Sequence, residues 1–164
     1  MTDHPGLERL NQLTPAEAEA ELKGCCASPR WAAALTAGRP YATIAALHDA
    51  AEQAWWSLDE PDWREAFAAH PRIGRLETAD PRARREQAGV TGASADTLAL
   101  LAEANRTYEE RFGRIFLICA SGRNADEMLA SLRERLNNDA GTEVRIAAGE
   151  QAKIMRLRLE RLLG

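Results

Sequence analysis

Apolar residues recur at helical spacing along almost the whole chain, and the alternation typical of strands is nearly absent. Over residues 98–112 the apolar positions step by threes, fours and sevens, which predicts a helix of about five turns that ends near Gly113. A second long helix is predicted over residues 144–163. The pattern therefore favours an all-α fold.

Helix starts are marked by side chains that can accept hydrogen bonds from free backbone N–H groups. Thr14 precedes a proline and lies three residues before Glu17, which predicts a capping box. Ser28 and Asp80 also precede prolines, and Asn124 precedes an acidic first turn. Each of these positions is expected to begin a helix.

One segment, residues 115–119, is short and continuously apolar, and it lies between Gly113 and Gly122. In so short a run, periodicity cannot separate a strand from another kind of buried segment. Because no second strand is predicted to pair with it, we interpret it as a buried helical or extended connection. Since the sequence has no internal repeats or linkers, we expect residues 1–164 to form a single all-α domain of about eight helices.

The composition is that of a soluble globular protein. Of the 164 residues, 45% are hydrophobic and 28% are charged, so neither a disordered chain nor a membrane protein is expected. The net charge of −4 argues against binding to nucleic acid, which needs a basic face. No apolar stretch approaches the roughly 20 residues of a transmembrane helix.

The cysteines and the N-terminus bear on where the protein acts. The first six residues are polar and lack the apolar core of a secretory signal. Cys25 and Cys26 are adjacent, and Cys119 is the third cysteine; adjacent cysteines rarely pair with each other. We therefore expect an intracellular, cytoplasmic chain with reduced thiols.

Motifs for metal or nucleotide chemistry are missing from the sequence. The cysteines lack the spacing of metal ligands, and neither a phosphate-binding glycine loop nor a nucleophile elbow occurs. Any chemistry is therefore expected to be proton transfer with no metal and no cofactor.

His70 is the main candidate for such chemistry. It precedes Pro71, which disfavours the α conformation at His70, so the imidazole is expected at the end of a helix. Histidine is the side chain whose ordinary pKa lies closest to neutrality, and a rigid corner suits proton transfer. Taken alone, the residue would more often be a helix-ending surface histidine.

Glu86 follows His70 by sixteen residues and is expected, with Gln87, in the last turn of a short helix that begins at Asp80. A carboxylate there opposes the helix dipole, which is locally unfavourable. The alternative is a solvated glutamate paired with a neighbouring arginine such as Arg82 or Arg85, and spacing alone favours that alternative.

Two polar residues are predicted on apolar helix faces. At 100° per residue, Arg158 lies about 20° from Gln151 and about 40° from Ile154, whereas Arg156 falls on the opposite face. A buried guanidinium needs acceptors, either from a structural carboxylate or from an anionic, carbonyl-rich ligand, and the sequence leaves both open. Asn105 similarly could be a satisfied core amide or a ligand contact.

Seven motifs stand out together along the chain: residues 25–31, 70–74, 86–90, 105–108, 112–113, 116–122 and 154–159. In this order they resemble the 2-oxo-4-hydroxy-4-carboxy-5-ureidoimidazoline (OHCU) decarboxylase family, which acts between urate and allantoin. The resemblance spans almost the whole chain, and the shared order of its motifs makes it specific. The resemblance implies an all-helical fold, a homodimer, and catalysis without a cofactor.

Residue by residue, the resemblance implies roles for part of these motifs. The family's catalytic histidine falls on His70, and its partner glutamate falls on Glu86. The positions that contact the substrate in the family fall on Pro71, Gln87, the backbone around Ile118, and Arg158.

The chain departs from the family pattern at two positions. Ala83 stands where the family usually has a serine whose hydroxyl bonds the substrate, and Arg114 replaces a commonly apolar residue. Ala83, together with Phe116 and Asn105 in their matching motifs, completes the set of candidate site residues.

The resemblance implies decarboxylation of OHCU to (S)-allantoin in urate degradation, with His70 as general acid and base. The partner is then a small ureidoimidazoline, with neither nucleic acid nor membrane involved. Two alternatives are a lyase for a related ureide and a non-catalytic helical interaction module.

Overall fold

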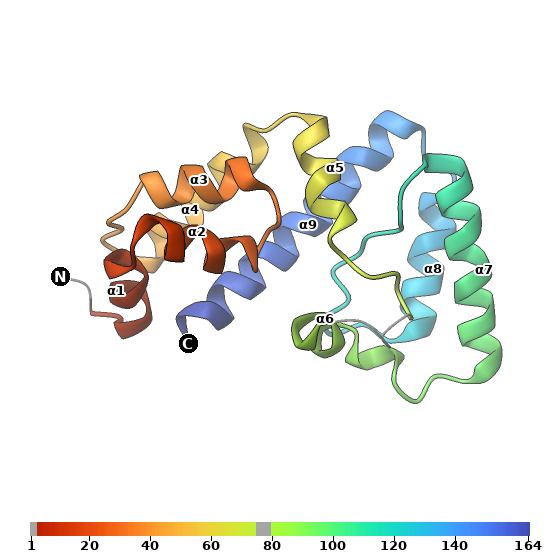
Figure 1. Cartoon of the computed structure of the whole chain (residues 1–164). Helices are drawn as coiled ribbons and strands as arrows, with labels where there is room; N and C mark the ends of the chain where they lie inside the picture. The colour runs from red at the N-terminus through yellow and green to blue at the C-terminus, as the bar shows by residue number, and fades with distance from the viewer. Residues whose placement is uncertain (1–2, 75–79) are drawn as a thin grey trace. The chain divides into compact units, whose positions relative to one another are not determined.

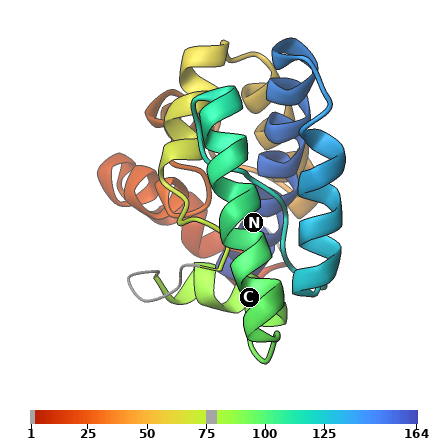
Figure 2. The ribbon, with the colours of Figure 1, turned by 90° about the vertical axis from the view of Figure 1, so that its right-hand side faces the viewer.

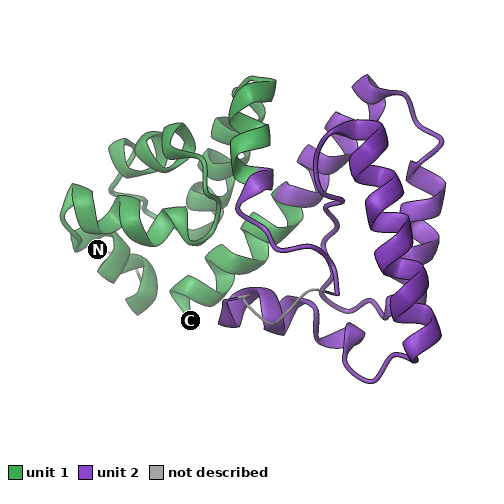
Figure 3. Ribbon diagram, turned by 45° about the vertical axis from the view of Figure 1, so that its right-hand side comes forward, with its two compact units in different colours: residues 1–66, 152–164 green, residues 67–151 purple. Residues whose placement is uncertain are grey.

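The computed structural model describes residues 3–74 and 80–164, and these residues form nine α-helices, one short 3-10 helix and no strand. The all-α prediction is confirmed, with one helix more than the eight expected. The chain divides into two compact units (Figure 3): residues 1–66 with 152–164, and residues 67–151. The single domain expected over residues 1–164 stays a prediction.

Unit 1 is built from the N-terminal helices and the end of the last helix (Figure 1). Trp31 and Trp55 are fully buried in it, and the Trp31 indole N–H donates to the carbonyl of Ala51 at 3.1 Å. Its helices are α1 (Pro5–Gln12), α2 (Pro15–Lys23), α3 (Pro29–Ala37), α4 (Ile44–Trp56), most of α5 (Glu60–Ala68) and the second half of α9 (Ala140–Leu163).

Unit 2 contains the remaining elements, and its helices α7 and α8 pack side by side (Figure 2). Leu101, Met128 and Leu132 are among the residues that fill the core between them. The elements of this unit are α6 (Pro81–Glu86), the 3-10 helix η1 (Ala88–Val90), α7 (Ala95–Phe112), α8 (Ala125–Arg135) and the first half of α9.

The predicted helix starts are confirmed. Thr14 and Asn124 form capping boxes with the glutamates three residues later, and the side chains of Ser28 and Asp80 accept hydrogen bonds from backbone N–H groups of their helices. Helix α7 ends before Gly113, whose φ of 72° is readily adopted only by glycine.

The start of the last helix was placed four residues too late. Helix α9 begins at Ala140, and the Asp139 carboxylate accepts a hydrogen bond from the Thr142 N–H at 2.7 Å. The first turn is thus held by a polar cap and not by the apolar periodicity that begins at Val144. Among the described residues, no helix is long and apolar enough to cross a membrane.

Gly89 marks a close approach of backbone in unit 2. A β-carbon added there would lie 1.8 Å from the carbonyl oxygen of Arg123, so the chain after α6 can lie against the start of α8 only with glycine at this position.

We expect Gly89→Ala to lower the free energy of unfolding by about 1–3 kcal/mol, because backbone must shift to admit the methyl group. Gly149→Ala is the matched control, since this helical glycine has no atom within 4 Å of the added carbon and should gain roughly 0.5–1 kcal/mol. Urea denaturation of both variants measures the difference. Equal stability of the two proteins would contradict the close approach.

Candidate functional site

His70 lies just after α5, where the sequence places it. Its backbone N–H donates to the carbonyl of Phe67, and its side chain is half-buried. Imidazole Nε2 lies 2.7 Å from Oε1 of Gln151 on α9, and that glutamine is fully buried. His70 is therefore a hydrogen-bonded side chain and not a free surface histidine.

The loop that follows His70 is held by two amide side chains. Gly74, with φ of 87°, donates its N–H to Oε1 of Gln87 at 3.0 Å. Asn105 donates from Nδ2 to the carbonyl of Ile73 at 3.2 Å. Gln87 thus joins the end of α6 to the histidine loop, and Asn105 has the structural bond of a satisfied core amide.

Glu86 is the last residue of α6 and is 7% exposed. The alternative of a solvated surface glutamate is therefore wrong. Ala83, one turn earlier, is 3% exposed, so its methyl group faces the same protected side of the helix. The arginines between them, Arg84 and Arg85, are exposed.

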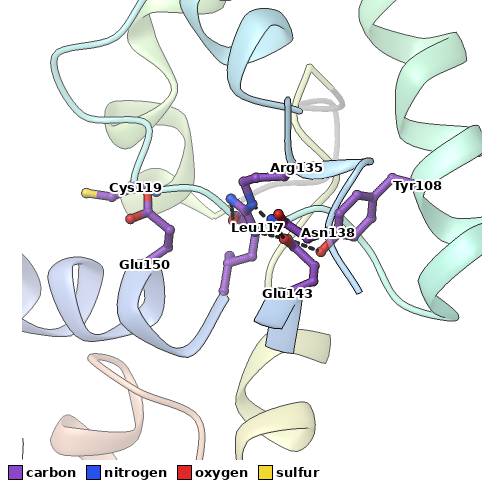
Figure 4. Close-up of polar contacts among 7 residues, drawn as sticks. All are labelled: Tyr108, Leu117, Cys119, Arg135, Asn138, Glu143 and Glu150. Atoms are coloured by element: carbon purple, nitrogen blue, oxygen red, sulfur yellow. Dashed lines mark hydrogen bonds and ion pairs between the residues drawn. The ribbon is translucent and has the colours of Figure 1, made fainter. Parts of the chain in front are cut away.

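Residues 115–120 form a connection that is neither helix nor strand, so of the two conformations predicted for this segment the helical one is wrong. Figure 4 shows how the backbone on either side of Ile118 is held. Arg135 Nη1 donates to the carbonyl of Leu117 at 2.7 Å, and the N–H of Cys119 donates to Oε1 of Glu150 at 3.1 Å. Ile118 itself is 2% exposed, so its peptide groups have a fixed position inside unit 2.

A buried ion pair supports the arginine of this arrangement (Figure 4). Arg135 Nε donates to Oε1 of the fully buried Glu143 at 2.7 Å. The same carboxylate accepts from the Tyr108 hydroxyl at 2.7 Å and from Asn138 Nδ2 at 3.1 Å. Burial raises the pKa of Tyr108, and its hydrogen bond to Glu143 raises it further. Arg135 also lies over the ring of Phe116, 4.5 Å from its centroid.

Arg158 lies in unit 1, on the face of α9 that helical phase predicts. Ile154 is buried, whereas Lys153 and Arg156 are exposed. Arg158 is half-buried, and its Nη1 donates to the carbonyl of Gly24 at 3.1 Å. This acceptor is a backbone carbonyl, whereas the sequence alternatives were a structural carboxylate and a ligand. The assignment of Arg158 to the site stays a prediction.

The cysteines of the chain are buried and form no disulfide bond. Burial raises the pKa of the Cys26 thiol to about 12, with nearby Arg158 acting in the opposite direction. Among the described residues, no group of three or more His, Cys, Asp or Glu side chains could hold a metal ion.

Sequence reasoning missed the role of Gln151 and of the side chains that hold the segment around Ile118. Gln151 had a visible signal, because it is an uncharged polar residue on the apolar stripe of α9. Arg135 and Glu150 had no such signal, because each lies on a helix among other charged residues and bonds a peptide group that is far away in the sequence.

A family model for OHCU decarboxylase matches residues 11–160. The 2-oxo-4-hydroxy-4-carboxy-5-ureidoimidazoline decarboxylase of Amia calva is 34% identical over 141 residues, which are 82% of this chain and 81% of that protein. The uric acid degradation bifunctional protein TTL of Arabidopsis thaliana is 39% identical over 88% of this chain, and the chain spans 47% of that longer protein.

Among solved structures, a crystal structure of an OHCU decarboxylase in the presence of (S)-allantoin aligns with a TM-score of 0.79 and 40% identity. The alignment covers 87% of this chain and 96% of that one. A crystal structure of (S)-allantoin synthase aligns with a TM-score of 0.73 at 20% identity, and this likeness supports the fold alone.

We expect Arg135→Met to lower the free energy of unfolding by about 3–5 kcal/mol, because it leaves the Glu143 carboxylate buried without its counter-charge. The double variant R135M/E143Q removes that charge as well and should regain part of the loss. Urea denaturation of the two proteins gives the comparison. If the E143Q substitution lowers the free energy of unfolding of R135M as much as an independent substitution would, the two side chains are not energetically coupled.

Proposed function

Since the chain belongs to the OHCU decarboxylase family, we propose that it converts OHCU to (S)-allantoin and CO2. The proposal rests on the structural match to an OHCU decarboxylase whose crystal structure was determined in the presence of (S)-allantoin. The alignment covers 96% of that protein's chain. The His70 loop and the buried end of α6 supply the acid–base groups such a reaction needs. The same proposal includes a small ureidoimidazoline as the substrate, a homodimer as the assembly and a cytoplasmic location.

The chemistry of the substrate sets what the site must do. One ring carbon carries both a carboxylate and a hydroxyl, and it adjoins a C=N bond. When the bond to the carboxylate breaks, its electron pair moves toward that C=N bond and CO2 leaves. A proton must then be delivered to one face of the ring, which fixes the S configuration.

His70 is suited to the proton steps, because an imidazole near neutrality can accept the hydroxyl proton and later return one. Glu86, buried at the end of α6, can accept hydrogen bonds from ring and ureido N–H groups. The peptide groups around Ile118 can bond polar atoms of the ring, and a guanidinium such as that of Arg158 can hold a carbonyl or carboxylate with two parallel bonds. Contacts that strengthen as negative charge moves into the ring stabilise the transition state and accelerate the reaction. Hydrogen bonds to the departing carboxylate alone would stabilise the bound substrate and would not accelerate it.

Ala83 favours a second candidate function, a lyase for a related ureide. A buried methyl group stands where the family has a hydroxyl, so one substrate hydrogen bond must be absent or come from elsewhere. A substrate lacking the corresponding polar group would fit this site equally well.

The decisive assay uses freshly generated OHCU and follows circular dichroism as (S)-allantoin forms. The proposal requires a rate well above that of spontaneous decay and a product of S configuration. A rate equal to the spontaneous one, or racemic allantoin, would refute it. Turnover of a related ureide with a higher kcat/KM would favour the second candidate.

His70→Asn should lower kcat by roughly 10²–10⁴-fold, the usual contribution of a general acid or base. The fold should persist, since the side chain is only half-buried. His4→Asn is the matched control, because asparagine can keep the cap that His4 provides to α1. Retention of more than half of the wild-type kcat by the His70 variant would remove His70 from the mechanism.

Arg158→Lys tests the residue that the family resemblance assigns to the substrate site. Lysine keeps the charge but lacks the planar fork, so kcat/KM should fall at least tenfold, equivalent to about 1.4 kcal/mol of transition-state stabilisation. Arg156→Lys on the exposed face should change almost nothing. If the melting temperature of the Arg158 variant falls in step with its activity, Arg158 is a structural residue.

A further inference from the structure

The contact between His70 and Gln151 points to a role for Gln151 that the sequence motifs do not assign. The two atoms, imidazole Nε2 and amide Oε1, lie 2.7 Å apart, at the short end of the range for N–H···O hydrogen bonds. The two residues are 81 positions apart in sequence and both belong to unit 2.

The chemistry of the two groups fixes the direction of this bond. An amide oxygen can only accept, so imidazole Nε2 must carry the proton. In the neutral ring the lone pair then resides on Nδ1. We propose that Gln151 is a positioning residue that holds His70 in the Nε2–H tautomer, so that Nδ1 is the atom that takes the proton from the substrate. This inference rests on the proposed decarboxylation.

The surroundings of Gln151 argue that its amide is not there for stability. Its side chain is fully buried, and its Nε2 has no hydrogen-bond partner among the described residues. An unsatisfied buried donor is unfavourable, and an apolar side chain of the same length would avoid it. Methionine is such a side chain, so a purely structural role and a positioning role predict different results for Gln151→Met.

We expect Gln151→Met to melt at or above the temperature of the wild type, while kcat falls at least tenfold and KM changes less than threefold. Gln53→Met, the same change at an exposed site on α4, should leave both parameters unchanged. A kcat above half of the wild-type value would overturn the proposal. So would an activity loss that merely parallels a loss of stability.

Gln151→Glu provides a readout that packing cannot imitate. A carboxylate beside Nε2 favours the protonated imidazole and raises the pKa of His70. If neutral His70 is the base, the acid limb of the pH–kcat profile should move to higher pH by about one unit or more. The other charged groups near this contact are the same in both proteins: Arg72 pairs with Glu109, and Glu150 accepts from Cys119. An unshifted profile would contradict the proposal.

The wild-type protein gives a test that does not depend on turnover. Nitrogen-15 NMR of the histidine side chains, with His70 assigned by comparison with His70→Asn, distinguishes the two tautomers. The proposal requires the proton on Nε2 above the pKa of the imidazole. A proton on Nδ1 would mean that Gln151 presents its amide nitrogen to the ring, and the proposal would fail even if the enzyme makes (S)-allantoin.

Discussion

A buried stretch of irregular backbone persists only if its peptide groups find partners, and this constraint governs residues 115–120. The segment crosses the interior of unit 2 without a helix or a neighbouring strand to satisfy it. Arg135 instead donates a hydrogen bond to the carbonyl of Leu117, and Glu150 accepts one from the N–H of Cys119. The position of Ile118 in the proposed site is therefore set by two charged side chains on helices α8 and α9.

Charged side chains so deep in a protein need support of their own. Glu143 supplies the counter-charge of Arg135, and Tyr108 and Asn138 occupy further acceptor sites of its carboxylate. A cluster of apolar residues could pack there at equal or greater stability, but it could not bond the carbonyl of Leu117. The ion pair is thus explained by the backbone it holds, and not by its contribution to stability alone.

Local signals in the sequence predicted most helix ends. Caps such as Thr14 and Asn124, and the glycine after α7, act within a few residues of their own position, so they can be recognised without tertiary structure. The conformation of residues 115–120 could not be predicted in this way, because its partners lie 18 and 31 residues away. Apolar periodicity also missed the first turn of α9, where a single aspartate makes the cap.

In the candidate site, too, features set by a single helix could be predicted, whereas features set by tertiary contacts could not. Helical phase predicted which face of α9 carries Arg158, since that depends on the helix alone. The burial of Glu86 could not be predicted, because a six-residue helix rich in arginine has no apolar stripe to orient it. Gln151 stood out as a polar residue on an apolar face, but its partner is 81 residues away, and only the fold brings His70 to it.

The restraints on the histidine loop share one chemical property that bears on its function. Gln151 holds the ring, Gln87 holds Gly74, and Asn105 holds Ile73, so all three are neutral amides. An amide does not titrate in the range where an imidazole gains or loses its proton. The geometry around His70 can therefore stay the same in both protonation states, which a residue that alternates between base and acid requires within each turnover. A carboxylate in place of Gln151 or Gln87 could also accept these hydrogen bonds, but it would favour the imidazolium and oppose its return of the proton. In place of Asn105, a carboxylate could not donate to the carbonyl of Ile73.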